Sequence, residues 1–170
     1  MSAWRSRSRR SRVGIRTLKR EEPPEPWRYG YANLPKGWEA KPPASSMRLA
    51  EAAIPASEGD PEGGQLAVFY FGPDSGSVEM NLNRWYGQFE QPDGRPSDQA
   101  AKTDTFKAGP IDITLVDLSG TQLASTMPAS ASPRHEGWRM LGAIVMAPDG
   151  PYYFKATGPA KTMGEQRESM

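Results

Sequence analysis

The apolar run Leu66–Phe71 constrains the fold more than any other segment of the chain, because none of its six side chains is polar enough to favour water. Successive residues of a β-strand point to opposite faces of a sheet, so a run of this kind would bury both faces. Its aromatic content and the turn residues Gly72–Gly76 that follow favour a strand over a helix. The sequence therefore predicts a central strand with cover on both sides.

A helix is predicted directly after that turn. Val78, Leu82, Trp85 and Phe89 recur at the 3.6-residue period of an amphipathic helix. Ser77 is a suitable N-cap for the first free amides, and the proline-rich segment 91–96 would end the helix.

The remaining segments predict an antiparallel sheet. Residues 47–54 fit a strand or a helix, residues 105–118 fit one or two strands before a turn at 117–121, and residues 138–147 pair with 151–157 as a hairpin. A last helix is expected from Gly158, and its lack of a stop signal suggests that it is cut short at Met170. The order predicts a single α+β domain over residues 27–170, with helices packed on a mainly antiparallel sheet. The expected core is Trp38, Leu66, Val68, Phe69, Phe71, Leu82, Trp85, Phe89, Ile113, Leu115, Leu141, Ile144 and Phe154.

The net charge of +1 hides a strong asymmetry. The first 20 residues hold eight basic residues and no acid, so the other 150, with 13 basic and 20 acidic residues, carry −7. Residues 1–26, basic and then rich in proline and glutamate, are predicted to be a disordered arm. The candidate polyanion contacts in this arm are Arg5, Arg7, Arg9, Arg10 and Arg12. A solvated tail, or upstream sequence from an early start site, is the alternative, and the acidic body argues against a dedicated nucleic-acid fold.

Several kinds of chemistry are excluded by composition. The chain has no cysteine and a single histidine, which removes thiol catalysis, cysteine-ligated metals and multi-histidine metal sites within one chain. No apolar stretch reaches the 18 residues of a membrane-spanning helix, and no export signal is seen. We interpret His135 as a solvated histidine in a polar loop over residues 128–137. No catalytic residue, metal ligand or cofactor is predicted.

The predicted helix carries the sharpest polar motif. Asn81, Asn83, Arg84 and Gln88 are the candidate binding residues, since Arg84 and Gln88 share a helix face and arginine suits bidentate contact with a carboxylate. The alternative is that these side chains tie the helix to neighbouring loops and strand ends.

This motif, Asn-x-Asn-Arg-Trp-x-x-Gln, resembles one in uncharacterised bacterial envelope proteins and lipoproteins. The similarity extends to residues 34–38, 46–50, 139–145 and 153–159. Such proteins begin with a secretory or lipoprotein signal, so the resemblance implies a cell-envelope location. The element order is similar to the PsbP-like fold, which implies an accessory or binding role.

Three functions follow as hypotheses. The first is a non-enzymatic binding or accessory domain of the bacterial cell envelope, with a protein or small-molecule partner. The second is an enzyme that uses two carboxyl groups in place of histidine or cysteine. The third is polyanion binding, to nucleic acid or a membrane surface, through the arm. The sequence sets no oligomeric state.

Overall fold

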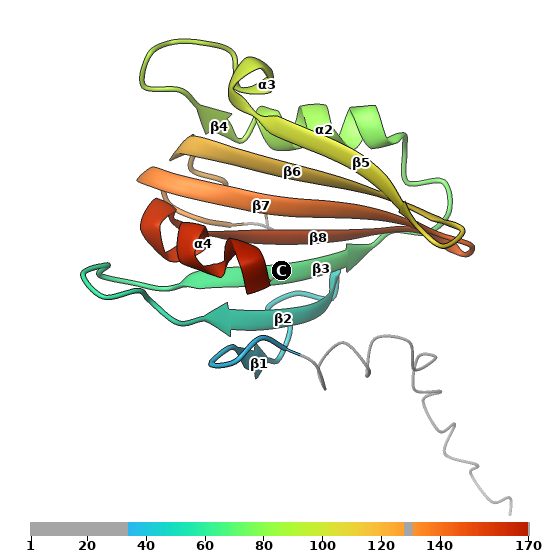
Figure 1. The fold of residues 1–170 in the computed structure, drawn as a ribbon, viewed down its shortest axis with the longest axis horizontal. Helices are drawn as coiled ribbons and strands as arrows, with labels where there is room; N and C mark the ends of the chain where they lie inside the picture. The colour runs from blue at the N-terminus through green and yellow to red at the C-terminus, as the bar shows by residue number, and fades with distance from the viewer. Residues whose placement is uncertain (1–33, 128–130, 170) are drawn as a thin grey trace, which may run out of the picture.

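The chain folds into a mainly antiparallel sheet with helices on both faces, so the α+β prediction is confirmed (Figure 1). The structure is a computed structural model that describes residues 34–127 and 131–169. Within these residues eight strands form one sheet in the order β1-β2-β3-β8-β7-β6-β4, and β5 pairs with β6 beside β4. The predicted arm over residues 1–26 lies outside the described residues. None of the helices in the described part is both long and apolar enough to span a bilayer.

The strands and helices follow the predicted order, with differences in extent and with some short elements in addition. The strands are β1 Glu39–Lys41, β2 Arg48–Ile54, β3 Gly64–Tyr70, β4 Phe89–Glu90, β5 Lys102–Ala108, β6 Ile111–Gln122, β7 His135–Ala147 and β8 Gly150–Pro159. The helices are α2 Val78–Tyr86, α3 Ser97–Ala100, α4 Ala160–Gln166 and the 3₁₀ helix η2 Arg167–Ser169. The segment left open between strand and helix is strand β2, and the predicted C-terminal hairpin is formed by β7 and β8.

The predicted turn at residues 117–121 is wrong, because β6 runs through it to Gln122. Gly120 lies in this strand, next to a bulge in the β6–β7 pairing. A Cβ atom at Gly120 would lie 2.7 Å from the carbonyl oxygen of Glu90. The glycine therefore allows β4 to approach β6 closely. In the sequence alone, the same glycine resembles a turn residue.

Helix α2 begins as predicted and ends earlier than predicted. The Ser77 side chain accepts a hydrogen bond from the backbone N–H of Met80 at 3.1 Å, which satisfies one free amide of the first turn. The helix ends at Tyr86, and Phe89 belongs to β4, which pairs with the end of β6. Sheet pairing thus competes with the last predicted helical turn, while Phe89 still reaches the core.

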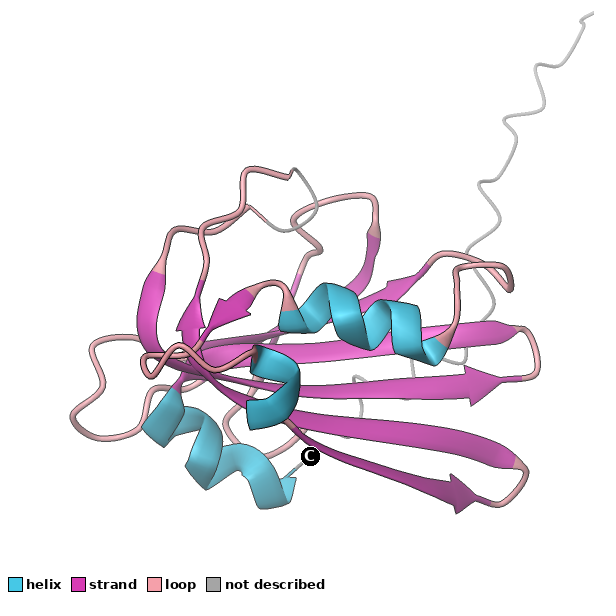
Figure 2. Cartoon of the chain, turned by 90° about the horizontal axis from the view of Figure 1, so that it is seen from above, coloured by secondary structure: helices cyan, strands magenta, loops and turns pink. Residues whose placement is uncertain are grey.

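The two faces of the sheet bury separate apolar cores, and Figure 2 shows helices on both sides of it. The face that carries α2 buries Trp85, Phe89, Val116, Leu118, Met140, Ile144 and Tyr153. The face that carries α4 buries Trp38, Ala52, Ile54, Leu141, Ala156 and Met163. Cover on both faces of β3 explains why its sequence is apolar at consecutive positions.

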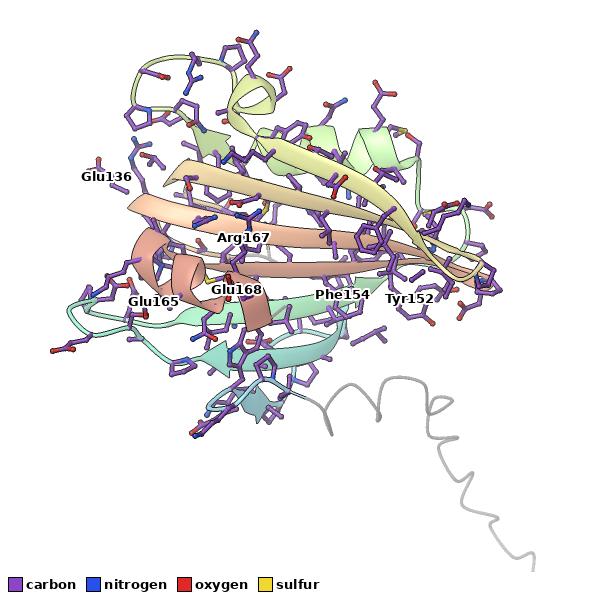
Figure 3. The ribbon with its side chains drawn as sticks, in the orientation of Figure 1. Glu136, Tyr152, Phe154, Glu165, Arg167 and Glu168 are labelled. Carbon is purple, nitrogen blue, oxygen red and sulfur yellow. The ribbon has the colours of Figure 1, made fainter. Side chains whose placement is uncertain are left out.

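Two predicted core residues are exposed. Phe71 follows the end of β3 and is 45% exposed, and Leu115 on β6 is 40% exposed. Leu115 shares the α4 face with Phe154 by strand register. Figure 3 shows Tyr152 and Phe154 on this face, beyond the part that α4 covers. Helix α4 is too short to bury the whole face, which periodicity alone does not reveal.

Helix α2 approaches the sheet at Gly142, where no side chain intervenes. A Cβ atom there would lie 2.5 Å from the Trp85 ring and 2.8 Å from Val116. We expect Gly142→Ala to lower the free energy of unfolding by about 1–3 kcal/mol, because the ring must shift away from the sheet. Urea denaturation measures this.

Gly87→Ala is the matched control. Its added Cβ would make only ordinary contact, 3.5 Å from Asn83, in a helical backbone conformation. A stability change of no more than about 1 kcal/mol is expected for the control. Equal destabilisation by both substitutions would contradict the role given to Gly142.

Candidate functional site

A pocket of about 260 Å³ lies on the α2 face of the sheet, along β3. Its floor comes from β3 and β8, and its walls come from the start of β2, the β2–β3 loop and the segment around residues 131–138. We call it the Lys155 pocket, and the lining residues used below are Arg48, Glu62, Gln65, Gln122, Trp138 and Lys155.

Lys155 is a partly buried amine that lacks a carboxylate partner. It lies on β8 opposite Gly142 and donates a hydrogen bond to the side-chain oxygen of Gln88, which lies between α2 and β4. Within the described part of the chain, no carboxylate oxygen lies within 4.0 Å of its Nζ atom. Burial, and then repulsion from Arg48, lower the pKa of Lys155 from 10.5 to about 8. The ammonium form is thus less stable here than in water.

Arg48, in contrast, has its charge balanced. Its Nη1 atom lies 2.9 Å from Oε2 of Glu51, and both side chains are about nine-tenths buried. Glu51 also accepts hydrogen bonds from the backbone N–H of Ala44, at 2.9 Å, and from Gln65. The guanidinium lies 5.8 Å from the centre of the Phe69 ring. Lys155 therefore supplies the unbalanced positive charge at this end of the pocket.

The other end of the pocket is built around His135. Its ring stacks on Trp138 with centroids 3.7 Å apart, and its Nδ1 atom lies 3.6 Å from Oε1 of Glu62. The interpretation of His135 as a solvated loop residue is wrong, because it begins β7, pairs with Gln122 and has a side chain only 17% exposed. Pairing with a distant strand, which local sequence does not reveal, orders this residue.

The residues of the helix motif take different positions. Asn81 is buried, and its side-chain amide donates to the Ser77 carbonyl at 2.8 Å and to the Tyr153 hydroxyl at 3.1 Å. Gln88 contacts Lys155, whereas Asn83 and Arg84 are exposed. The structure thus brings Gln88 to the pocket, places Asn81 in contacts that hold α2 to the sheet, and leaves Asn83 and Arg84 apart.

Sequence reasoning missed Lys155, Arg48 and Gln122. One signal was present: Lys155 lies within the predicted strand 151–157 and shares its strand face with Tyr153. A lysine on a face expected to be buried is unusual and marks a site to inspect. Arg48 and Gln122 reach the pocket only through strand register, which local sequence does not give.

A second, more open cleft of about 320 Å³ lies beside Arg139. The Nε and Nη2 atoms of Arg139 donate hydrogen bonds to the two carboxylate oxygens of Asp117, both at 2.7 Å. Burial raises the pKa of Asp117, but the hydrogen bonds and charge of Arg139 outweigh burial, so the pKa is lowered overall. The charge of Arg139 is therefore balanced by a bidentate pair within the chain.

Two further points concern the predicted polyanion contacts and metal binding. The candidate polyanion contacts Arg5, Arg7, Arg9, Arg10 and Arg12 lie outside the described residues. Among residues 34–127 and 131–169, no three histidine or carboxylate side chains come together in a way that could hold a metal ion.

Arg84 distinguishes the two interpretations of the helix motif. It is exposed and makes no side-chain hydrogen bond or ion pair with the described residues. We expect Arg84→Ala to change the free energy of unfolding by less than about 0.5 kcal/mol, as measured by thermal melting. A loss of several degrees in melting temperature would instead assign Arg84 a structural role.

The pKa of Lys155 predicts a specific dependence of stability on pH. The value is about 8 in the folded chain, below the ordinary 10.5, so above pH 8 the unfolded chain binds more protons than the folded one. The free energy of unfolding should therefore rise with pH, by up to about 1.4 kcal/mol per unit. Lys155→Met should remove this contribution.

Urea denaturation from pH 8 to pH 10 measures the difference between the two proteins. The exposed Lys161 provides the control, since Lys161→Met should leave the slope unchanged. Above pH 10 Tyr152 acts in the opposite sense, because its hydrogen bond to Asp149 raises its pKa from 10.0 to about 12. Parallel curves for wild type and Lys155→Met would contradict the assignment.

Comparisons with known proteins assign no family. No family model, no curated protein and no solved structure matches this chain. A proposal about function therefore depends on the residues of the pocket and on the sequence resemblance described above.

Proposed function

We propose that this chain is a non-enzymatic binding or accessory domain of the bacterial cell envelope, and that it binds a small anionic ligand in the Lys155 pocket. The observation that carries the ligand class is the amine of Lys155, which is partly buried and has no carboxylate partner in the described part of the chain. A negatively charged ligand would supply that partner and would stabilise the ammonium form.

The surroundings of Lys155 support binding of a small molecule. The pocket is slightly smaller than the usual range of ligand sites, which begins at about 300 Å³. Gln88 orients the amine from one side, and the Arg48–Glu51 pair holds the neighbouring wall in place. An arrangement fixed by such contacts needs little reordering when a ligand binds, which favours affinity.

The envelope location and the PsbP-like fold belong to this proposal through the sequence resemblance. The antiparallel sheet between α2 and α4 agrees with the PsbP-like element order. Fold likeness alone does not assign a ligand, so the pocket carries that part of the proposal.

The enzyme hypothesis has less support. Catalysis by two carboxyl groups needs a close pair in which one pKa is raised. Among the described residues, the carboxyl groups with a resolved pKa shift are Glu39, Asp93 and Asp117, and each shift is downward. Detectable turnover of hydrolase substrates that one point substitution abolishes would overturn the non-enzymatic assignment.

Binding of simple anions tests the ligand class. We expect acetate and succinate to shift backbone amide NMR signals of residues 65–67 and 155–157 in a saturable way. Lys155→Met should raise Kd about 10- to 100-fold, the value of one hydrogen bond to a charged group. Affinity for the wild type should also fall as pH rises above about 8, because the ammonium form is lost.

Lys161→Met serves as the control, because this lysine is exposed, lies outside the pocket lining and donates a hydrogen bond to the carbonyl of Glu58. Circular dichroism establishes that both variants are folded. Saturable anion binding that is the same in wild type and Lys155→Met would overturn the proposed site.

A further inference from the structure

The open cleft beside Arg139 gathers charged side chains on the α4 face of the sheet. Asp117 pairs with Leu141 of the α4-face core, and Arg139 lies two residues from Leu141 on β7, so Asp117 and Arg139 share this face. They line the cleft of about 320 Å³ together with Arg95 and Lys102. Among the described residues that line it, three are cations and one is a carboxylate. We call it the Asp117 cleft.

Several cations share the carboxylate of Asp117. Arg139 donates hydrogen bonds to both of its oxygens, and Oδ2 also lies 3.7 Å from Nε of Arg167, which comes from η2 after α4 (Figure 3). Lys102 lies directly opposite Asp117 in the pairing of β5 with β6. Burial raises the pKa of Asp117, whereas the charges of Arg139, Arg167 and Lys102 lower it. Three cations therefore act on one carboxylate.

The positive charge of this group exceeds the negative charge. Within the described part of the chain, no carboxylate oxygen lies within 4.0 Å of Nζ of Lys102. Asp104 shares the strand face of Lys102 but lies outside the lining, opposite Leu115. Lys102, Arg139 and Arg167 carry three positive charges against the single negative charge of Asp117, which leaves an excess of two. The chain beyond residue 20 carries −7, so composition does not account for this excess.

The fold fixes the floor of the cleft. The side chains of Asp117 and Arg139 are only 14% and 20% exposed. A Cβ atom at Gly164 on α4 would lie 3.1 Å from Nη1 of Arg139, so the absence of a side chain there leaves room for the guanidinium. The Ser119 hydroxyl also lines the cleft and makes no side-chain hydrogen bond with the described residues. A ligand would thus meet an ordered floor, an unpaired hydroxyl and excess positive charge.

We propose that the Asp117 cleft binds a small phosphomonoester, with its phosphoryl group held by Lys102, Arg167 and the Ser119 hydroxyl. A phosphoryl group carries about −1.5 to −2 charge at pH 7, which matches the excess positive charge of the cleft. Its three terminal oxygens accept hydrogen bonds from different directions, and the three donors come from β5, η2 and β6. The site is separate from the Lys155 pocket and gives the chain a second ligand.

The size and lining of the cleft favour an ester over free phosphate. A volume of about 320 Å³ lies at the lower end of ligand sites, and an inorganic phosphate ion would fill only a small part of it. Gln91 and Ala100 line the remainder, and no aromatic side chain is among the described residues that do so. These surroundings suit the phosphate of a short polar alcohol.

Glycerol 3-phosphate is the probe, added to the full chain and followed by amide NMR signals. At about pH 7.5 its phosphoryl group is mainly a dianion, because the second pKa is about 6. We expect saturable shifts at Lys102, Ser119 and Arg139, with affinity at least about threefold higher than for inorganic phosphate or succinate. Equal affinity for succinate, a dianion without phosphorus, would overturn the phosphoryl group. Equal affinity for inorganic phosphate would overturn the ester.

Lys102→Met tests the charge that lacks a partner. We expect it to raise Kd for glycerol 3-phosphate about tenfold, near the lower end of the value of a hydrogen bond to a charged group. Lys107→Met is the matched control, because Lys107 is exposed on the same strand, pairs with Asp112 at 2.6 Å and lies outside the lining. The control should stay within about twofold of wild type, since screening limits its effect at this distance. Equal losses in both variants would overturn the site.

Arg167→Gln is a second, independent variant, because Arg167 comes from a different element and its side chain is 59% exposed. It should weaken glycerol 3-phosphate by about three- to tenfold. Circular dichroism establishes that each variant is folded. Unchanged affinity in Arg167→Gln would contradict the proposed position of the phosphoryl group.

Lys155→Met separates this inference from the proposed function. Glycerol 3-phosphate should still shift the signals of Lys102 and Ser119 in that variant. Shifts confined to residues 65–67 and 155–157, and lost in Lys155→Met, would overturn the Asp117 cleft and support the Lys155 pocket. Shifts at the cleft, with no response of residues 65–67 to acetate, would support this inference and overturn the proposed function.

Discussion

The contact between Trp85 and the bare backbone at Gly142 sets the distance between α2 and the sheet. Because no side chain intervenes, the indole lies against β7, and its edge also meets Tyr153 with ring centroids 6.5 Å apart. Asn81 holds the same helix by its hydrogen bond to the Tyr153 hydroxyl. These contacts bring the end of α2 over β8, where Gln88 reaches Lys155. The polar site thus depends on an apolar contact one helical turn away.

Lys155 illustrates a conflict between stability and binding. A partly buried amine beside an arginine is less stable as an ammonium ion than it would be in water. A carboxylate from the chain itself would relieve this, as Glu51 does for Arg48. The described residues supply only the neutral oxygen of Gln88 in its place. Residues with this kind of unfavourable environment are frequent at functional sites, where a ligand completes the set of contacts.

Sequence reasoning recovered the features that depend on neighbouring residues. The strand at Leu66, the helix with Ser77 as its cap and the C-terminal hairpin follow from periodicity and turn chemistry, and each is confirmed. It failed where distant segments decide the outcome. Phe89 left the helix to pair with β6, and His135 joined a strand through Gln122.

The residues of the candidate site show the same difference between features set by neighbouring residues and features set by distant segments. Gln88 was named from a helical motif, but its partner is 67 residues away and is selected by strand order. Which lysine is buried, and whether a carboxylate faces it, are properties of the assembled sheet. Composition and spacing carry no information on either.

The two edges of the sheet carry charged side chains that oppose association through strand pairing. Part of the α4 face is apolar and uncovered, and strand β5 is exposed along its whole length. However, β5 carries Lys102, Asp104 and Lys107, and β1 at the opposite edge carries Glu39 and Lys41. A strand from another copy would have to strip water from these charges before it could extend the sheet. Charged edge strands therefore oppose aggregation by sheet extension, although part of the α4 face is apolar and uncovered.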